Sequence, residues 1–165
     1  MYQLSVYLHI VAATVWVGGL LFLALVAVPA ARQLPPPERA RVTALLGRRF
    51  LPIAWGALAI LVVTGVINLA YRGATWEGLL TGRLFGGAYG RVLGVKLILV
   101  VLTLGLSALH DFRIGPQARR LAQRERADAG GVLRLRRAAT RIGRLNAAIA
   151  LAIVALAVLL VRGVP

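Results

Sequence analysis

Residues 4–30 read LSVYLHIVAATVWVGGLLFLALVAVPA, an apolar run with a few polar side chains and no Asp, Glu, Lys or Arg. About 20 apolar residues in a helix suffice to cross the ~30 Å hydrocarbon core of a bilayer. The run has no basic residue ahead of it, and it is much longer than the apolar core of a signal peptide. It therefore predicts a transmembrane helix that is retained in the protein.

Three more runs, 51–71, 92–109 and 145–161, are also long and apolar enough to span a bilayer. The chain has 165 residues, of which 59% are hydrophobic, and this length has room for one domain. We therefore expect an all-α integral membrane four-helix bundle, with residues 1–165 forming a single four-span transmembrane domain. There is no cysteine, so disulfides and thiolate metal sites are excluded.

The distribution of arginine predicts how the bundle is oriented in the membrane. Fifteen arginines lie in the segments 32–49 and 111–144, whereas four lie on the other side, at Arg162 and within 72–91. Basic residues close to transmembrane ends stay in the cytoplasm, so we expect both termini outside and a basic cytoplasmic loop. The net charge of +15 is then explained by orientation and by anionic lipid headgroups, and it does not indicate nucleic acid.

The two longer connections have patterns of their own. Along the outer segment 72–91, expected to be amphipathic, and into the third run, glycine recurs every four residues, at Gly78, Gly82, Gly86, Gly90 and Gly94. On a helix this spacing gives a smooth face that a second backbone or a flat ligand can approach. The alternative is a flexible glycine-rich loop. The basic segment 117–140 is expected to form a helical hairpin or an amphipathic surface helix, broken at Gly130-Gly131.

Polar side chains inside the membrane are costly and often mark function. Counting ~1.5 Å per residue from the outer end of each run places four of them at a similar depth in the outer leaflet: His9, Thr64, Asn68 and Lys96. Trp16 shares a helix face with His9, because the two are seven residues apart. The second histidine, His110, falls at the cytoplasmic boundary.

These residue types fit the binding of haem or of a metal ion. A histidine in an apolar bundle is a natural axial ligand for haem iron, and a neutral lysine can supply a second ligand. Arginine at the outer rim would pair with the haem propionates. The expected cofactor-binding residues are His9, Trp16, Thr64, Asn68, Arg91 and Lys96, and the expected metal ligands are His9, Lys96 and His110. Copper fits less well, because Cu(I) prefers thiolate or thioether ligands and the chain has no cysteine and one methionine.

The first run also carries a family resemblance. The stretch Leu8-His9 through Trp16-Val17-Gly18-Gly19-Leu20-Leu21-Phe22 resembles the opening helix of the CopD copper-resistance family. The sequence YGRVLGVKL at 89–97 and the pair Thr64-Gly65 are similar to later parts of that family. The resemblance covers residues 4–112 and implies a multi-pass protein of the bacterial inner membrane, associated with copper uptake or resistance.

The pattern is also similar to the HemJ-type protoporphyrinogen oxidases, small four-helix proteins that bind haem b. That family has a first-helix histidine ahead of a tryptophan and a lysine that opens a later helix, which His9, Trp16 and Lys96 match. The chain departs from it at 27–31, where no arginine follows the proline, and at Leu109-His110, where the family has a tyrosine–histidine pair. The resemblance therefore implies a haem pocket more than the oxidase activity.

From the residues and these resemblances we predict a CopD-like inner-membrane protein that binds haem b in an outer-leaflet pocket. Its role would be redox chemistry or electron transfer, with a quinone or another redox partner. Whether it is an enzyme stays open, and if it is one, we expect a membrane haem oxidoreductase. Two alternatives remain. One is a copper uptake or resistance transporter. The other is a non-catalytic membrane subunit or assembly factor whose glycine-rich faces bind a partner helix or a second copy of the chain.

Overall fold

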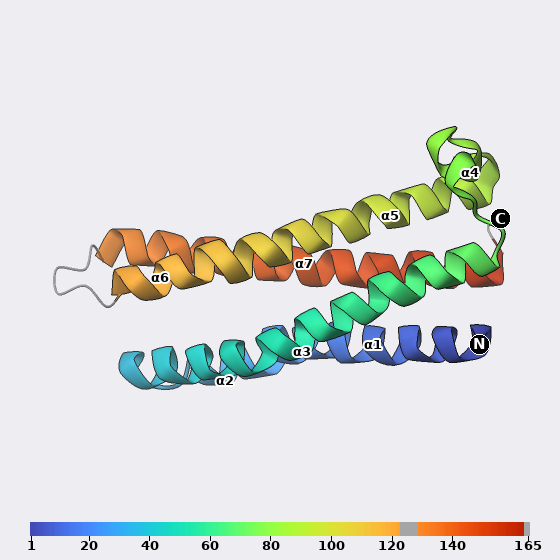
Figure 1. Ribbon diagram of the computed structural model, residues 1–165. Helices are drawn as coiled ribbons and strands as arrows, with labels where there is room; N and C mark the ends of the chain where they lie inside the picture. Colours follow the sequence, from blue (N-terminus) through green and yellow to red (C-terminus); the bar gives the residue numbers. More distant parts are fainter. Residues whose placement is uncertain (123–128, 164–165) are drawn as a thin grey trace.

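The computed structural model of the chain describes residues 1–122 and 129–163. All of its regular structure is helical, and four stretches are long and apolar enough to cross a membrane: Tyr2–Ala31, Pro36–Tyr71, Gly87–Ala118 and Gly130–Arg162. They lie side by side as an elongated bundle (Figure 1). The prediction of an all-α protein with four membrane-spanning helices is therefore confirmed, and the outward faces of these helices contact lipid.

The four spans are assembled from shorter elements. In chain order the α-helices are α1 (Tyr2–Phe22), α2 (Val28–Ala31), α3 (Pro36–Tyr71), α4 (Trp76–Leu80), α5 (Gly87–Ala108), α6 (Gly115–Ala122) and α7 (Ala129–Arg162). Two π-helical turns, η1 (Leu23–Ala27) and η3 (Leu109–Ile114), continue α1 into α2 and α5 into α6. A short 3₁₀ turn, η2 (Arg83–Phe85), precedes α5. Within the bundle, α1 packs mainly on α3 and α5 mainly on α7.

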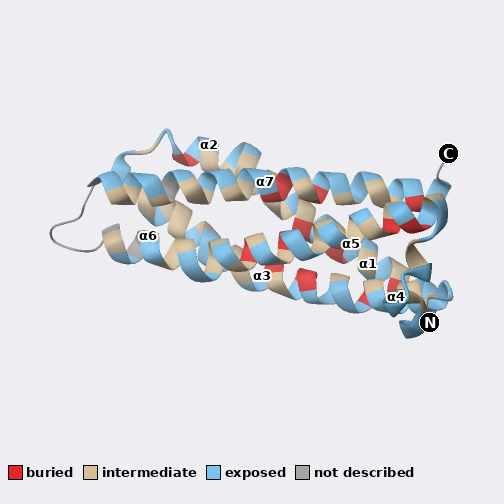
Figure 2. Cartoon of the chain, turned by 90° about the horizontal axis from the view of Figure 1, so that it is seen from above, coloured by how far each residue is buried: buried red, intermediate tan, exposed pale blue. Residues whose placement is uncertain are grey.

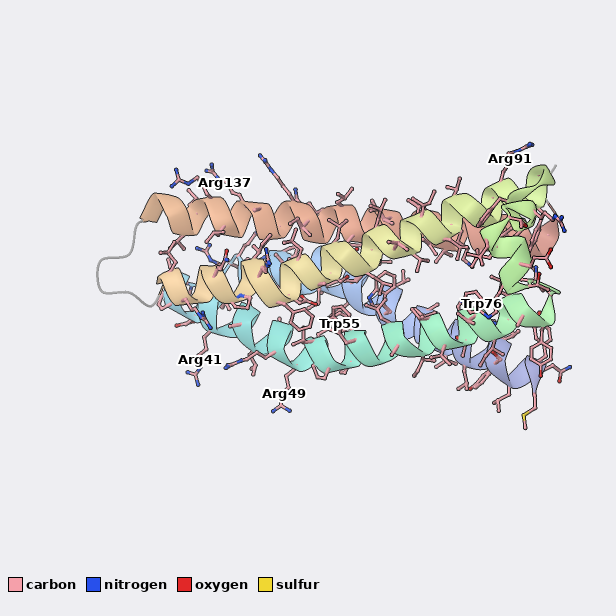
Figure 3. The ribbon with its side chains drawn as sticks, turned by 45° about the horizontal axis from the view of Figure 1, so that its top comes forward. Arg41, Arg49, Trp55, Trp76, Arg91 and Arg137 are labelled. Atoms are coloured by element: carbon pink, nitrogen blue, oxygen red, sulfur yellow. The ribbon has the colours of Figure 1, made fainter. Side chains whose placement is uncertain are left out.

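The two ends of the bundle differ in charge. Both termini and α4 lie at one end, which we call the termini end (Figure 1). Toward the opposite end, the arginine end, Arg41, Arg49 and Arg137 point away from the helices (Figure 3). α3 and α7 have 36 and 34 residues and are therefore about 50 Å long at 1.5 Å per residue. They exceed the hydrocarbon thickness by roughly 20 Å, so their arginine-containing N-terminal parts extend beyond it.

The predicted break at Gly130-Gly131 is wrong. α6 and α7 pack against each other as a helical hairpin, but α7 begins at Ala129 and runs through both glycines without interruption. The two glycines fall in the first turn of α7. Residues 123–128, which connect the two helices, lie outside the described part of the chain.

The glycine repeat does not form one continuous helical face. Gly82 and Gly87 adopt positive φ angles of 75° and 69°, which only glycine tolerates easily, and they separate α4, η2 and α5. Gly90 and Gly94 do lie on one face of α5, but the chain's own η2 turn covers them. A Cβ atom at Gly90 would lie 2.6 Å from the Leu84 carbonyl oxygen, and one at Gly94 would lie 3.2 Å from the Phe85 ring. At these two positions, the chain's own η2 turn occupies the groove that was predicted for a partner helix.

The core lies where α1, α3 and α7 meet, around Trp16. Its buried residues are mostly small, and they are Ala12, Trp16, Ala54, Ala57, Leu58 and Ala150. Small side chains let membrane helices approach closely, which replaces the hydrophobic driving force that lipid cannot supply. Figure 2 shows the buried positions as short patches on helices that are otherwise exposed or half-buried, as expected for helices whose outer faces contact lipid.

A pair of adjacent glycines on α1 gives a test of this packing. A Cβ atom at Gly19 would collide with the ring of Phe50 on α3, whereas a Cβ atom at Gly18 meets nothing within 4 Å. Alanine is favoured over glycine in a helix by about 1 kcal/mol, and overpacking costs about 1–3 kcal/mol. We therefore expect Gly18→Ala to raise the free energy of unfolding and Gly19→Ala to lower it. Denaturant unfolding of the two variants in detergent, followed by circular dichroism, measures this. Equal effects would show that Phe50 moves away without cost.

Candidate functional site

Near the termini end, polar side chains from α1, α3 and α5 form a group that we call the His9 cluster (Ser5, His9, Thr64, Asn68 and Lys96). At its centre, Nδ1 of His9 lies 2.8 Å from Oγ1 of Thr64. Ser5 Oγ donates a long hydrogen bond of 3.5 Å to the Thr64 carbonyl oxygen. Two residues of α1 are thus tied to one residue of α3. The structure brings together His9 and Thr64, two of the residues that the sequence placed at one depth.

The hydrogen bonds of Thr64 suit one tautomer of His9. The Thr64 hydroxyl has a single proton, and the Ile60 carbonyl oxygen lies 2.5 Å from Oγ1. When that proton is donated to Ile60, Oγ1 accepts from Nδ1–H of His9 and Nε2 keeps its lone pair. Histidine ligands of metal ions are held in this way, with the other ring nitrogen donating to a neighbouring group. The bond thus leaves His9 in the tautomer that a metal ligand at Nε2 requires.

Lys96 and Asn68 add an amine and an amide to the His9 cluster. Lys96 on α5 is half-buried, and its charge interacts with both His9 and Arg72. Asn68 lies one turn after Thr64 on α3, and its Oδ1 is buried without a hydrogen-bond partner. Buried polar atoms are nearly always hydrogen-bonded, so an unpaired one indicates capacity for a ligand. Within one helical turn on α3, a partner of His9 (Thr64) is thus followed by an unused acceptor at Asn68.

Arg72 closes the cluster at the termini end. Its Nη1 donates to the Tyr89 hydroxyl at 3.1 Å and to the Leu160 carbonyl oxygen at 3.5 Å, which ties the end of α3 to α5 and α7. The hydrogen bond with Tyr89, followed by one with Tyr2, raises the pKa of Arg72 above its ordinary value. The guanidinium therefore stays charged at physiological pH. Arg91, which the sequence put forward for haem propionates, is exposed and points away from the bundle (Figure 3).

A second polar group, the His110 cluster (Trp55, Ser107, His110, Asp111 and Asn146), lies toward the arginine end. Asp111 accepts from Trp55 Nε1 at 3.0 Å through Oδ2, and its Oδ1 lies 2.8 Å from Nδ1 of His110. Figure 3 shows Trp55 on α3 directed toward the chain segment after α5. Asn146 Nδ2 donates to Ser107 Oγ at 3.0 Å, linking α7 to α5. The sequence pointed to His110, but it gave no signal for Trp55, whose partner lies 56 residues away.

A cavity of about 120 Å³ adjoins the His110 cluster, and Trp16 lines it together with Leu20, Phe50, Ala54 and Leu58. Neither His9 nor Lys96 is among its lining residues. Pockets for drug-sized ligands and cofactors occupy about 300–1,000 Å³, so this cavity is too small for haem. Trp16, expected to share a cofactor pocket with His9, lies instead in the core and borders this second space.

The ligand set limits what either cluster can hold. Within residues 1–122 and 129–163, no group of three or more His, Asp or Glu side chains converges on a metal position. Each cluster has one imidazole, and the remaining donors are amide, hydroxyl, amine or carboxylate groups. Imidazole suits copper as well as zinc and iron, and oxygen donors added to it suit Cu(II). Either cluster therefore offers a single imidazole together with weaker oxygen and amine donors.

Sequence comparison identifies relatives of the chain. An uncharacterized protein of Aquifex aeolicus (strain VF5) is 33% identical over 119 residues, which is 72% of this chain and 73% of that protein. The copper transport protein CutJ of Bacillus subtilis (strain 168) is 33% identical over 104 residues. That match covers 63% of this chain but 18% of CutJ, so the chain corresponds to a small part of that protein. No solved structure matches the chain.

The sequence profile of one protein family covers most of the bundle. It is described as Copper resistance protein D (CopD), and it matches residues 44–160. The matched region contains Thr64, Asn68 and Lys96 of the His9 cluster and the whole His110 cluster, while His9 itself lies ahead of it. With four membrane-spanning helices and this match, the chain belongs to the CopD family of copper-resistance membrane proteins.

Proposed function

We propose that the chain binds copper as its cargo at the His9 cluster and passes it through the membrane. The observation that carries this proposal is the CopD profile match over residues 44–160, together with the similarity to a copper transport protein. Both comparisons name copper and neither names haem. They favour the copper alternative over haem b. The sequence had favoured haem b because the chain has no cysteine and one methionine.

The chemistry of the His9 cluster supports copper as the cargo. Nε2 of His9 supplies the nitrogen lone pair, and the unpaired Oδ1 of Asn68 supplies an oxygen donor. Copper at His9 and an ammonium at Lys96 repel each other, so binding of the ion favours release of the Lys96 proton. The freed amine then adds a second nitrogen donor. A site of two nitrogens and one amide oxygen suits Cu(II).

Orientation gives the transport a direction. By the positive-inside rule, the arginine end lies in the cytoplasm and the termini end outside. The His9 cluster then receives copper from the outer side of the bacterial inner membrane. The absence of cysteine favours passage over storage, since oxygen and single imidazole donors hold copper less tightly than thiolates hold Cu(I). Residues 1–165 would act as a single four-span domain in this process.

Copper uptake by proteoliposomes containing the full chain tests the proposal. We expect time-dependent accumulation of copper well above that of protein-free vesicles, and copper bound by the purified protein after loading and desalting. The absorption spectrum of protein expressed with adequate haem supply is the matching control. A Soret band, with no copper bound and no uptake above protein-free vesicles, would show that the chain binds haem and would contradict the copper proposal.

A further inference from the structure

The cavity at the His110 cluster has the features of a built site that the His9 cluster does not use. It is lined by residues of all four spans and has a volume of about 120 Å³, enough for an ion with several water molecules. Most of its lining is apolar. The polar residues on it are Ser107, His110, Asp111 and Asn146. The polar atoms thus gather in one part of an otherwise apolar space.

Asn146 is the clearest sign that this cavity takes a ligand. It is 5% exposed, and its Nδ2 donates to Ser107, but its Oδ1 is buried without a hydrogen-bond partner. A buried carbonyl oxygen that lacks a donor or a cation destabilises the fold. Since Asn146 lines the cavity, an occupant there would satisfy it.

His110 is held as metal-ligating histidines are held. Its Nδ1 lies 2.8 Å from Oδ1 of Asp111, and the other carboxylate oxygen of Asp111 accepts from Trp55. A carboxylate that accepts from one ring nitrogen fixes the ring and makes the other nitrogen more basic. Among the described residues, no Arg or Lys pairs with Asp111, so beside a neutral His110 the carboxylate keeps its negative charge for a cation.

Two π-helical turns border the same cavity. His110 and Asp111 lie on η3, and Leu23, another lining residue, lies on η1. Such turns are rare and are found frequently at functional sites, where the wider turn re-aims side chains. The two turns belong to different spans, and both border this one cavity. This convergence indicates a functional site.

Thr103 lies between the two clusters along α5. It is seven residues from Lys96 and seven from His110, or about 10 Å from each at 1.5 Å per residue. It is 2% exposed, and its Oγ1 has no hydrogen-bond partner. Unpaired polar atoms therefore occur at three levels of the bundle: Asn68, Thr103 and Asn146.

From these observations we infer that the His110 cavity is a second copper-binding site, which receives the ion on the arginine side of the bundle. Nε2 of His110 and Oδ1 of Asn146 are its ligands, Asp111 supplies charge, and water completes the coordination. This inference rests on the proposed function, since it takes copper as the cargo. It adds a separate site that His9 does not share.

The test counts Cu(II) equivalents bound by the full chain in nanodiscs and follows tryptophan fluorescence, because Cu(II) in the cavity would lie beside Trp16. We expect two equivalents in the wild type and one in either His9→Ala or His110→Ala. Quenching should persist in His9→Ala and be clearly weaker in His110→Ala, where only the more distant copper at His9 remains. If His110→Ala does not fold, Asn146→Asp serves in its place: the added charge should tighten the second site by about tenfold or more.

The outcomes separate this inference from the proposed function. If the wild type binds a single equivalent of Cu(II), which is lost in His9→Ala and kept in His110→Ala, the second copper-binding site is overturned and the proposed function still holds. Affinity that falls in Asn146→Asp would likewise overturn it, since a cation must prefer the carboxylate. A wild type that binds no copper would overturn the proposed function itself.

Discussion

Replacing His9 with alanine is expected to abolish copper binding at the His9 cluster and to lower copper uptake by at least about 100-fold, since loss of even a second-shell partner costs about 10–100-fold in metal affinity. His9 is the one imidazole in the cluster, and its Nε2 is the nitrogen donor that is present without loss of a proton from Lys96. Asn68 and Ser5 offer oxygen, which binds copper more weakly than imidazole nitrogen. The measurement is the initial rate of copper uptake by proteoliposomes, at equal amounts of inserted protein.

Two variants control for loss of the fold and for the tautomer of His9. Thr14→Ala removes a hydroxyl from the same helix, but this residue is exposed and its Oγ1 donates only to Ile10 of its own helix. It should leave uptake unchanged. Thr64→Val keeps the shape of Thr64 but removes the acceptor for Nδ1, so copper affinity should fall by about 10–100-fold. Wild-type uptake in His9→Ala would contradict the proposed role of this residue.

The largest expected effect on stability comes from Gly90, where α5 receives the backbone of η2. A Cβ atom there would lie 2.6 Å from the Leu84 carbonyl oxygen and 2.7 Å from Cα of Phe85. Backbone cannot move aside as a side-chain end can, so Gly90→Ala must displace the whole turn. We expect a loss of about 1–3 kcal/mol or more in the free energy of unfolding, despite the gain of about 1 kcal/mol in helix propensity.

Gly105 provides the matched control on the same helix. A Cβ atom at Gly105 meets nothing within 4 Å, so Gly105→Ala should keep the helix propensity gain and raise stability by up to ~1 kcal/mol. Denaturant unfolding in detergent compares the two variants. If both were equally stable, η2 would not be packed on α5, and the glycine face would be open to a partner helix after all.

The sequence alone determined the number of spans and their approximate limits. In a bilayer every backbone N–H and C=O group must be paired within the segment, so four apolar runs had to become four helices. Because each run is a helix, the depth of a side chain in the membrane could be predicted by counting ~1.5 Å per residue along the run. His9 and Thr64 were expected to share a level, and they are joined by a hydrogen bond. No such physical constraint supported the ranking of haem above copper. It rested on the absence of thiols, which limits Cu(I) sites but leaves Cu(II) with nitrogen and oxygen donors.

Only the tertiary structure decided what each side chain meets, because that depends on how the helices rotate about their axes and on how the connections fold. The pairing of Trp55 with Asp111 joins residues 56 positions apart, across two helices. The burial of Gly90 depends on the positive φ angles at Gly82 and Gly87, which turn the connection back onto α5. The His110 cavity arises from side chains of all four spans and from two π-helical turns. No local pattern encodes these features, since each is fixed by packing between segments that are distant in the chain.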